Sequence, residues 1–174
     1  MQVVHGQKNG CPPRCDLEAA RTLNDALLGL ICGGGVKSAH DCSEGGLALC
    51  LAECCVSQQP LRETPRLIGA SVDLSVLSEA AATLSEPAAP SAAAAVVRLD
   101  ALLFGETQNR VIVTAHPLHI AKILERAKRL GIPARQVGRV GGDQLTVKTE
   151  TGEWSWPVSA LHDAWWNSLA RAMA

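Results

Sequence analysis

Hydrophobic residues recur at helical spacing in several stretches of the chain, and residues typical of helix ends bound each stretch. The first predicted helix covers residues 16–31, with Asp16 as a candidate N-cap. Three further helices are predicted over residues 47–56, 117–130 and 158–173. In the last of them, the spacing predicts that Leu161, Trp165 and Leu169 face the core.

Shorter apolar runs predict strands between these helices. The predicted strands cover residues 36–40, 67–74, 110–115, 134–140 and 143–149, the first of them buried. The dipeptide Gly141-Gly142 separates the last two and predicts a two-residue β-hairpin. Residues 99–104 predict a helical turn, whereas the Ala- and Pro-rich segment at 78–95 predicts a short helix followed by a flexible surface loop.

Helices and strands thus alternate along most of the chain. This order predicts an α+β fold, a layered α/β/α domain with a mixed, largely antiparallel sheet. At 174 residues the chain is long enough for one domain with a core and short for two, so residues 1–174 are expected to form a single domain. With one Phe and no Tyr, the core is expected to be aliphatic.

Net charge and hydropathy exclude several kinds of partner. The formal net charge is −1, which argues against a nucleic-acid partner and gives no reason to expect an anionic membrane surface. No apolar run approaches the ~20 residues that a membrane-spanning helix needs, and residues 1–8 lack the apolar core of a secretory signal. We therefore expect a cytoplasmic protein.

The chain contains seven cysteines, an odd and scattered set. Such a set without an export signal is typical of reduced thiols and not of a disulfide framework. Cys11 with Cys15, and Cys50 with Cys54, lack the C-x₂-C spacing of zinc sites. Cys50 and Cys54 lie one helical turn apart, where they can pack as small apolar residues.

Polar residues concentrate in two clusters. The first, Lys37-Ser38-Ala39-His40-Asp41-Cys42-Ser43-Glu44-Gly45-Gly46, leads into the predicted helix 47–56, and the second is Leu103-Phe104-Gly105-Glu106-Thr107-Gln108-Asn109-Arg110. The start of a helix has unpaired N–H groups and partial positive charge, so the first cluster suits an anion or a metal-bound phosphate. We expect the two clusters to converge at the mouth of one cleft.

Four stretches resemble one known family, in the order that the family shows. They read VHG near the start, KSAHDCSEGGLALCLAECC, LFGETQNRVIVT and VGRVGGDQLTV, and the closing VSALHDAWWNSL is also similar. The family is phosphoribosylformylglycinamidine (FGAM) synthase, and the part that matches is its C-terminal domain, a domain related to AIR synthase. The resemblance covers nearly the whole chain, and the SAHDCSEGGLA and LFGETQNR motifs together make it specific.

This resemblance implies a role in purine biosynthesis. The family converts formylglycinamide ribonucleotide, ATP, glutamine and water to the amidine, ADP, phosphate and glutamate. The resemblance implies Mg²⁺ and ATP or ADP as cofactors of the parent enzyme, with this chain next to a nucleotide or phosphate site. The chain resembles the lid domain of the enzyme's second half and lacks the catalytic histidine. It should therefore be inactive alone, and its partners would be the remaining domains and a glutaminase subunit. Surface that those domains normally cover could also favour self-association.

Roles for the first cluster follow from the resemblance. Asp41 corresponds to an acidic residue that looks like a magnesium ligand in the family's first half, and carboxylates suit Mg²⁺. The candidates for phosphate binding beside it are Lys37, Ser38, His40, Ser43, Gly45 and Gly46. The alternative is structural: Asp41 or Ser43 caps the following helix, His40 bonds the backbone, Lys37 is solvated and the glycines form a tight turn.

The second cluster resembles a substrate-binding loop of the family's first half. Glu106 belongs to the matching run, Thr107 can donate to a phosphate, Gln108 offers an amide and Arg110 carries a fixed positive charge for an oxyanion. Alternatively, this loop only holds the following strand against the first cluster.

Two other functions remain possible at this point. The chain could be the lid of a related ATP-dependent synthetase, although LFGETQNR argues against those relatives. It could also be a structural or inter-domain interaction module in which the polar clusters only join neighbouring domains.

Overall fold

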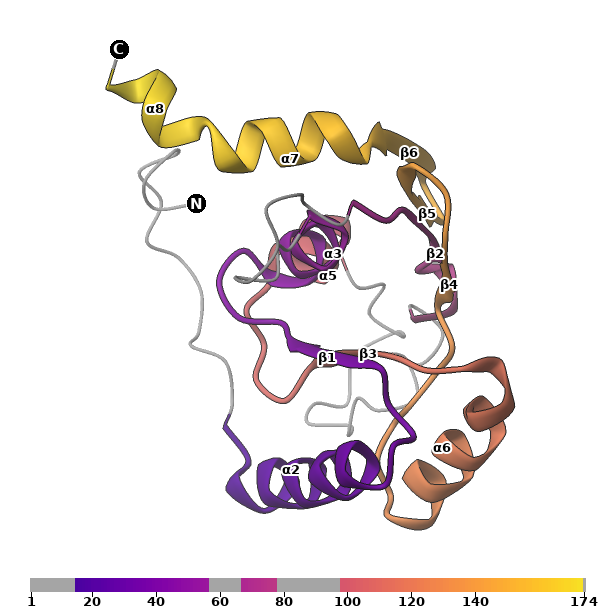
Figure 1. The fold of residues 1–174 in the computed structure, drawn as a ribbon. Helices are drawn as coiled ribbons and strands as arrows, with labels where there is room; N and C mark the ends of the chain where they lie inside the picture. Colours follow the sequence, from indigo (N-terminus) through magenta and orange to yellow (C-terminus); the bar gives the residue numbers. More distant parts are fainter. Residues whose placement is uncertain (1–14, 57–66, 78–97, 174) are drawn as a thin grey trace.

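The structure is a computed structural model that describes residues 15–56, 67–77 and 98–173 (Figure 1). Its helices are α2 (Leu17–Cys32), α3 (Gly46–Val56), α5 (Leu99–Phe104), α6 (Pro117–Arg129), α7 (Val158–Trp166) and α8 (Ser168–Ala172). Its strands are β1 (Ser38–Asp41), β2 (Ala70–Asp73), β3 (Val111–Thr114), β4 (Gly138–Val140), β5 (Gln144–Thr149) and β6 (Gly152–Pro157). The Ala- and Pro-rich segment at 78–95 lies outside the described residues.

Helices α2 and α6 begin at the residues that the sequence predicts for their starts. The Asp16 side chain accepts hydrogen bonds from the N–H groups of Glu18 and Ala19, at 3.0 and 2.9 Å, and this confirms the predicted N-cap of α2. Helix α6 begins at Pro117, as predicted, because proline has no N–H to leave unpaired in the first turn.

The strands form two separate ladders, and together they are mixed and mostly antiparallel, as predicted. Strands β1 and β3 pair antiparallel, with His40 opposite Ile112 and Asp41 opposite Val111. The other four pair in the order β4-β2-β5-β6, and only β2 and β5 run parallel. The fold is therefore α+β.

The predicted hairpin at Gly141-Gly142 is wrong, because β2 lies between β4 and β5. The Gly69 N–H donates to the Gly142 carbonyl at 2.9 Å, and the Gly141 N–H donates to the Gly69 carbonyl at 2.8 Å. The Gly-Gly segment thus bonds the start of β2, which passes between the two strands. Close approach needs a glycine at 69, since a Cβ there would overlap the Gln144 backbone. The observed hairpin joins β5 and β6.

The core lies between the four-stranded sheet and helix α3. Helix α3 also packs against α5 and α7 (Figure 1). The most deeply buried large side chains are those of Leu74, Val56, Val158 and Cys50. Because the core is built almost wholly from Leu, Val and Cys, the predicted aliphatic character is confirmed.

Three local predictions are wrong: the burial of the first strand, the unbroken helix at 158–173 and the inward direction of Trp165 and Leu169. Strand β1 is not buried, since its residues are exposed or half-buried. The predicted helix 158–173 breaks at Asn167 into α7 and α8. Trp165 is 44% exposed and Leu169 is 75% exposed, so neither is a core residue, whereas Leu161 does pack against the core.

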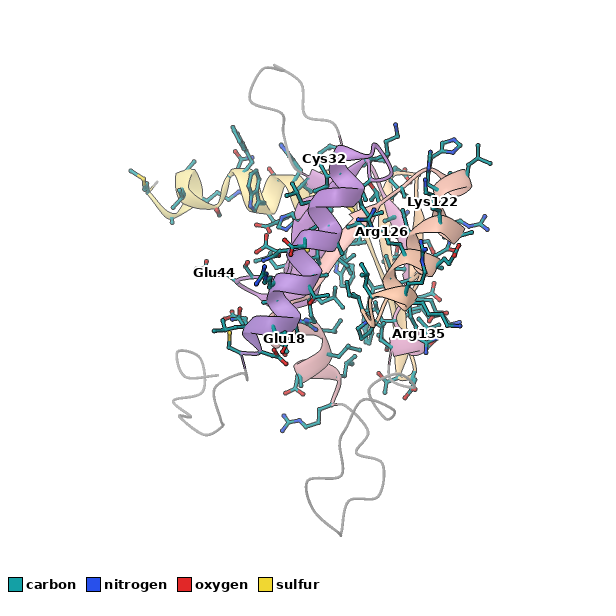
Figure 2. All side chains as sticks on the ribbon, turned by 90° about the horizontal axis from the view of Figure 1, so that it is seen from below. Glu18, Cys32, Glu44, Lys122, Arg126 and Arg135 are labelled. Atoms are coloured by element: carbon teal, nitrogen blue, oxygen red, sulfur yellow. The ribbon has the colours of Figure 1, made fainter. Side chains whose placement is uncertain are left out.

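Helices α2 and α6 contribute little to the core. Each buries a single side chain, Ala26 in α2 and Ala127 in α6. Arg126 of α6 reaches across to Gly29 of α2, and Figure 2 shows it between the two helices. Among the described residues, no helix is long and apolar enough to cross a membrane.

Candidate functional site

The two polar clusters meet at the ends of paired strands. The Cys42 N–H donates to the Arg110 carbonyl at 2.8 Å, which extends the β1–β3 ladder by one bond. Beyond it, the Gly45 N–H donates to Glu106 Oε1 at 3.0 Å. The structure thus brings together the His-Asp-Ser segment and the Glu-Thr-Gln segment. No residue of the second cluster lines the pocket beside Asp41, so the expected single cleft with both clusters at its mouth stays a prediction.

The Gly45-Gly46 pair makes this meeting possible. Both residues have left-handed backbones, with φ of +74° and +67°. A Cβ on Gly46 would lie 2.8 Å from the Phe104 carbonyl carbon and 2.9 Å from the Gly105 oxygen. The close approach that glycine allows at position 46 is therefore to the second cluster of the chain itself.

A carboxylate already stands at the start of α3. Glu106 accepts the Gly45 N–H just before this helix begins, so its negative charge lies where helix N–H groups are unpaired. The predicted seat for an anion is thus occupied by a side chain of the chain itself. Asp41 and Ser43, the two residues that the structural alternative predicts as caps of this helix, are bonded to each other.

Asp41 accepts a hydrogen bond from the Ser43 hydroxyl, two residues later. This bond is the main cause that lowers the pKa of Asp41, helped by its own backbone and by His40. Its side chain is 74% exposed. An ionised, accessible carboxylate supplies the oxygen ligand that a hard cation prefers.

His40 is held from both sides of its ring. Its Nδ1 lies 2.8 Å from the Asp41 carbonyl and its Nε2 lies 3.3 Å from Glu53 Oε2. Burial favours the neutral ring, but the Asp41 carbonyl and the negative charges of Cys54, Glu53 and Asp41 outweigh it and raise the pKa of His40. Since both partners are acceptors, the protonated ring satisfies both contacts.

A shallow pocket opens beside these groups. It is lined by His40, Asp41, Ser43, Glu44, Leu49, Cys50 and Glu53. Three of these residues are acidic, and no lysine or arginine is among them. The pocket therefore repels a bare phosphate and attracts a cation.

The donor set fits Mg²⁺ only as a phosphate complex. Among the residues that the structure describes, no group of three or more His, Cys, Asp or Glu side chains is arranged to hold a metal ion. Mg²⁺ commonly takes one or two protein carboxylates and completes its shell with phosphate oxygens and water. Asp41 can provide one such carboxylate.

Arg110 is engaged inside the chain. Its guanidinium donates to the Leu102 carbonyl at 3.2 Å and to the Gly105 carbonyl, both in the segment that precedes it. These bonds hold the end of α5, so the predicted contact with an oxyanion competes with an existing structural role. Arg110 Nε is buried and has no hydrogen-bond partner among the described residues.

Lys37 and Ser38 lie at the opposite end of the β1–β3 ladder from Asp41, since Ser38 pairs with Thr114 and Asp41 pairs with Val111. Lys37 is exposed, and its N–H donates to the Thr114 carbonyl at 2.7 Å. The Ser38 hydroxyl lies 2.6 Å from the Thr114 hydroxyl. Thr107 and Gln108 are exposed in the loop before β3. Nothing in this placement tests their binding roles, which remain predictions.

Two residues of the pocket, Glu44 and Glu53, are absent from the predicted site. Glu53 is the one charged residue in the sequence of α3, GLALCLAECCV. A single charge in an otherwise apolar helix is unusual, and that signal could have marked it.

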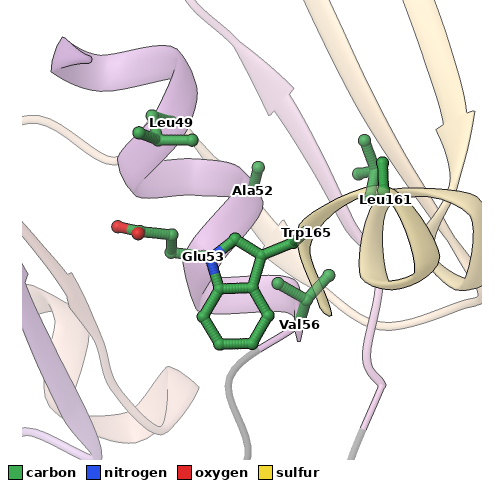
Figure 3. A pocket seen from close by; sticks show the side chains of 7 residues that line it. Leu49, Ala52, Glu53, Val56, Leu161 and Trp165 are labelled. Atoms are coloured by element: carbon green, nitrogen blue, oxygen red, sulfur yellow. The ribbon is translucent and has the colours of Figure 1, made fainter. Parts of the chain in front are cut away.

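The thiols behind the pocket differ in acidity. Hydrogen bonding with Cys50 is the main cause that lowers the pKa of Cys42 and that of Cys54, each to about 7. The same contacts raise the pKa of Cys50, and burial raises that of Cys55 to about 11. A second cleft, which shares Leu49 and Glu53 with this pocket, is otherwise apolar. Figure 3 shows it between α3 and the α7 residues Leu161 and Trp165.

Comparison with known proteins defines the class of domain. The family described as "AIR synthase related protein, C-terminal domain" matches residues 1–149, and the chain belongs to this family.

Within it, the chain is similar to subunits of one enzyme. It is 34% identical over 167 residues, 95% of its length, to the phosphoribosylformylglycinamidine synthase subunit PurL of Anaeromyxobacter dehalogenans (strain 2CP-C). It is 32% identical over 96% of its length to the same subunit of Thermobifida fusca (strain YX). The chain spans only about a fifth of these relatives, 19% and 18% of their lengths.

Solved structures show the same fold. T. maritima PurL complexed with FGAR aligns with 90% of this chain at a TM-score of 0.63 and 23% identity. T. maritima PurL complexed with ATP aligns with 89% at a TM-score of 0.62 and 22% identity. In both, the match covers 23% of the larger protein.

Proposed function

We propose that this chain is the C-terminal lid domain of an FGAM synthase, the ATP-dependent enzyme that forms the amidine FGAM from formylglycinamide ribonucleotide. The observation that carries the proposal is the junction of the two motif segments through Gly45 and Glu106. This junction gives SAHDCSEGG and LFGETQNR, which are far apart in the sequence, one common location. The similarity to PurL subunits over 95% of the chain supports the same conclusion.

In this role the pocket beside Asp41 takes a nucleotide or phosphate together with Mg²⁺. Asp41 would hold the ion, Ser43 would fix the carboxylate, and the ion would supply the positive charge that the pocket lining lacks. Thr107 and Gln108 are exposed in the loop before β3 and could contact phosphate oxygens, whereas Lys37 lies at the opposite end of the β1–β3 ladder from Asp41. Nucleotide complexes of T. maritima PurL support a nucleotide as the ligand class.

Residues 1–174 would form one domain of a larger cytoplasmic enzyme, with its other domains and a glutaminase subunit as partners. The exposed apolar side chains of Trp165, Trp166, Leu169 and Met173 support a covering partner or self-association. The domain alone should not catalyse the ligase reaction, since it corresponds to only 19% of the relative's length.

One alternative has specific support. Glu106, Gly46 and Arg110 all make their close contacts within the chain. A purely structural domain, in which both polar clusters only join the lid to its neighbours, would show the same contacts. The two functions differ in whether Asp41 binds a ligand.

Thermal unfolding with Mg²⁺ and ADP separates them. A lid with a working site should unfold at a higher temperature when both ligands are present at millimolar concentration, and Asp41→Asn should abolish this shift. Asp73→Asn is the matched control, because Asp73 also accepts a hydrogen bond from a serine two residues later but lies outside the pocket. An equal shift in wild type and Asp41→Asn, or no shift in wild type, would refute the proposed site.

A further inference from the structure

The polar pocket beside Asp41 and the apolar cleft between α3 and α7 adjoin each other. They share two lining residues, Leu49 and Glu53. The pocket has a volume of about 320 Å³ and the cleft one of about 230 Å³. Small-molecule sites usually measure about 300–1,000 Å³, so each alone lies near or below the lower limit, and a ligand of nucleotide size would use both. The pocket and the cleft together are called the α3 groove below.

The apolar end of the α3 groove is built from one stripe of each helix. Its lining residues recur at helical spacing along α3 and along α7. Figure 3 shows the Trp165 ring projecting from α7 towards α3. Glu53 is the one charged residue of this lining, and the others apart from Trp165 are Leu49, Ala52, Val56, Leu161 and Ala164.

Trp165 gives this end a large flat ring. The residue is 44% exposed, so part of the ring is accessible. Its ring is tilted by 40° to that of Trp166, whereas Trp166 lies nearly parallel to His162, at 11°. An accessible indole in an apolar cleft suits a flat aromatic ligand, because stacking removes apolar surface of both rings from water. Nucleobases stack on aromatic side chains in this way.

Glu53 lies where the two ends of the α3 groove join. Its side chain is 32% exposed, and its Oε2 lies 3.3 Å from His40 Nε2. A carboxylate has about four acceptor positions, so Glu53 can hold His40 and also accept a hydrogen bond from a sugar hydroxyl. The groove thus offers a carboxylate for a metal ion at Asp41, an acceptor at Glu53 and a flat ring at Trp165. A metal-bound nucleotide has the same order of parts: phosphates, ribose and base.

We propose that the α3 groove binds a Mg²⁺-bound purine nucleotide with its phosphates towards Asp41 and its base stacked on Trp165. This inference rests on the proposed function and deepens it, since it assigns the base of the ligand to the cleft between α3 and α7. It also selects among phosphate ligands. Formylglycinamide ribonucleotide carries a phosphate and a ribose but no aromatic base, so it would gain nothing from Trp165.

Calorimetric titration of the full chain with two ligands tests the base end. In the presence of Mg²⁺, ADP brings phosphates and a base, whereas pyrophosphate brings phosphates alone. Trp165→Ala should weaken ADP binding about tenfold, the size of one lost stacking contact, and should leave pyrophosphate binding unchanged. Trp166→Ala is the matched control, because Trp166 is an exposed neighbour that does not line the cleft, and it should bind ADP like wild type.

Tryptophan fluorescence provides a second measurement that keeps the ring. Trp165→Phe should retain most of the affinity for ADP, since phenylalanine also stacks on a base. ADP should quench the fluorescence of wild type and pyrophosphate should not, and most of the quenching should be lost in Trp165→Phe. This comparison decides the matter if Trp165→Ala fails to fold.

The outcomes separate this inference from the proposed function. Unchanged ADP affinity in Trp165→Ala, while Asp41→Asn abolishes binding, would overturn the inference and leave the proposed function intact. An equal loss of ADP and pyrophosphate affinity in Trp165→Ala would also overturn it, because Trp165 would then act on the pocket as a whole. A wild-type chain that does not bind ADP would refute both.

Discussion

Two turns of this chain share the pattern Asp-x-Ser at the end of a strand. Asp73-Leu74-Ser75 follows β2, and Asp41-Cys42-Ser43 follows β1. In each, the aspartate accepts a hydrogen bond from the serine hydroxyl, which is the main cause that lowers its pKa. In each, the middle residue belongs to the core cluster.

Their surroundings differ in charge. Asp73 is paired with Lys148 of β5 at 3.1 Å and also accepts the Ser75 N–H, so its charge is balanced within the sheet. Asp41 has Glu44 and Glu53 in its pocket, and His40 is the one basic residue of the lining. The Asp41 side chain is 74% exposed, against 41% for Asp73.

The same local motif therefore serves two purposes. A balanced aspartate within a sheet stabilises the fold, whereas an exposed aspartate in an acidic pocket is available to a cation. Neighbouring charges, and not the motif, mark the candidate site.

The largest expected effect is on stability, and it differs between the middle residues of the two turns, Leu74 and Cys42. Leu74→Ala should lower the free energy of unfolding by about 4 kcal/mol, because it leaves a cavity at a side chain that is 1% exposed. Cys42→Ala should lower it by about 1 kcal/mol, since it removes one sulfur. Urea unfolding measures both, and equal losses would contradict this ranking.

The next effect tests how closely the Asp41 turn packs against the second cluster. Gly46→Ala should destabilise the chain by about 3 kcal/mol, because it combines a strained backbone with overlap at Phe104 and Gly105. Gly34→Ala is the control, with φ of +68° and nothing within 4 Å of the new Cβ, and should lose about 1 kcal/mol. Similar losses would mean that the two clusters do not pack closely.

A smaller effect concerns the balanced aspartate. Hydrogen bonds from Ser75 and Lys148 hold the pKa of Asp73 below its ordinary value of 3.8, so its contribution to stability is present above that pH and is lost as pH falls through the folded pKa. Asp73→Asn should therefore melt below wild type at pH 7, and this gap should narrow at pH values below 3.8. A melting-temperature difference that stays constant with pH would show that the charge of Asp73 does not act in this way.

The smallest expected effect concerns the charge at the start of α3. Glu106→Gln should keep an acceptor for the Gly45 N–H but lose about 0.5 kcal/mol of stability through the missing charge. Glu106→Ala loses the bond as well and should lose about 1 kcal/mol. Unfolding in high salt should reduce the difference between wild type and Glu106→Gln, because salt screens exposed charges. If neither variant lowers the free energy of unfolding, the hydrogen bond between Gly45 and Glu106 does not stabilise the contact between the two clusters.

The sequence predicts those features that depend on neighbours in the chain. Asp16 and Pro117 locate helix starts, and the two polar clusters stand out because no propensity explains them. The hairpin prediction at Gly141-Gly142 failed because this segment bonds Gly69, which is distant in the sequence. Strand β2 follows Gly69 and lies between β4 and β5. Periodicity along the chain cannot reveal an inserted strand.

The details of the candidate site depend equally on distant contacts. The residue types predict a polar cleft, but only the fold shows that Glu106 occupies the start of α3 and that Arg110 is bound to backbone carbonyls. Trp165 and Leu169 follow a helical period, yet α7 and α8 leave them at the surface. Their exposure reflects tertiary packing, which the amino-acid pattern does not contain.

Calorimetric titration of ADP into the chain, with and without Mg²⁺, tests the central claim most directly. The account predicts that ADP binds wild type and Asp73→Asn only when Mg²⁺ is present, and that Asp41→Asn does not bind it in either condition. Binding of ADP that is equally tight without Mg²⁺, or unchanged in Asp41→Asn, would contradict an acidic pocket that takes phosphate through a metal ion at Asp41.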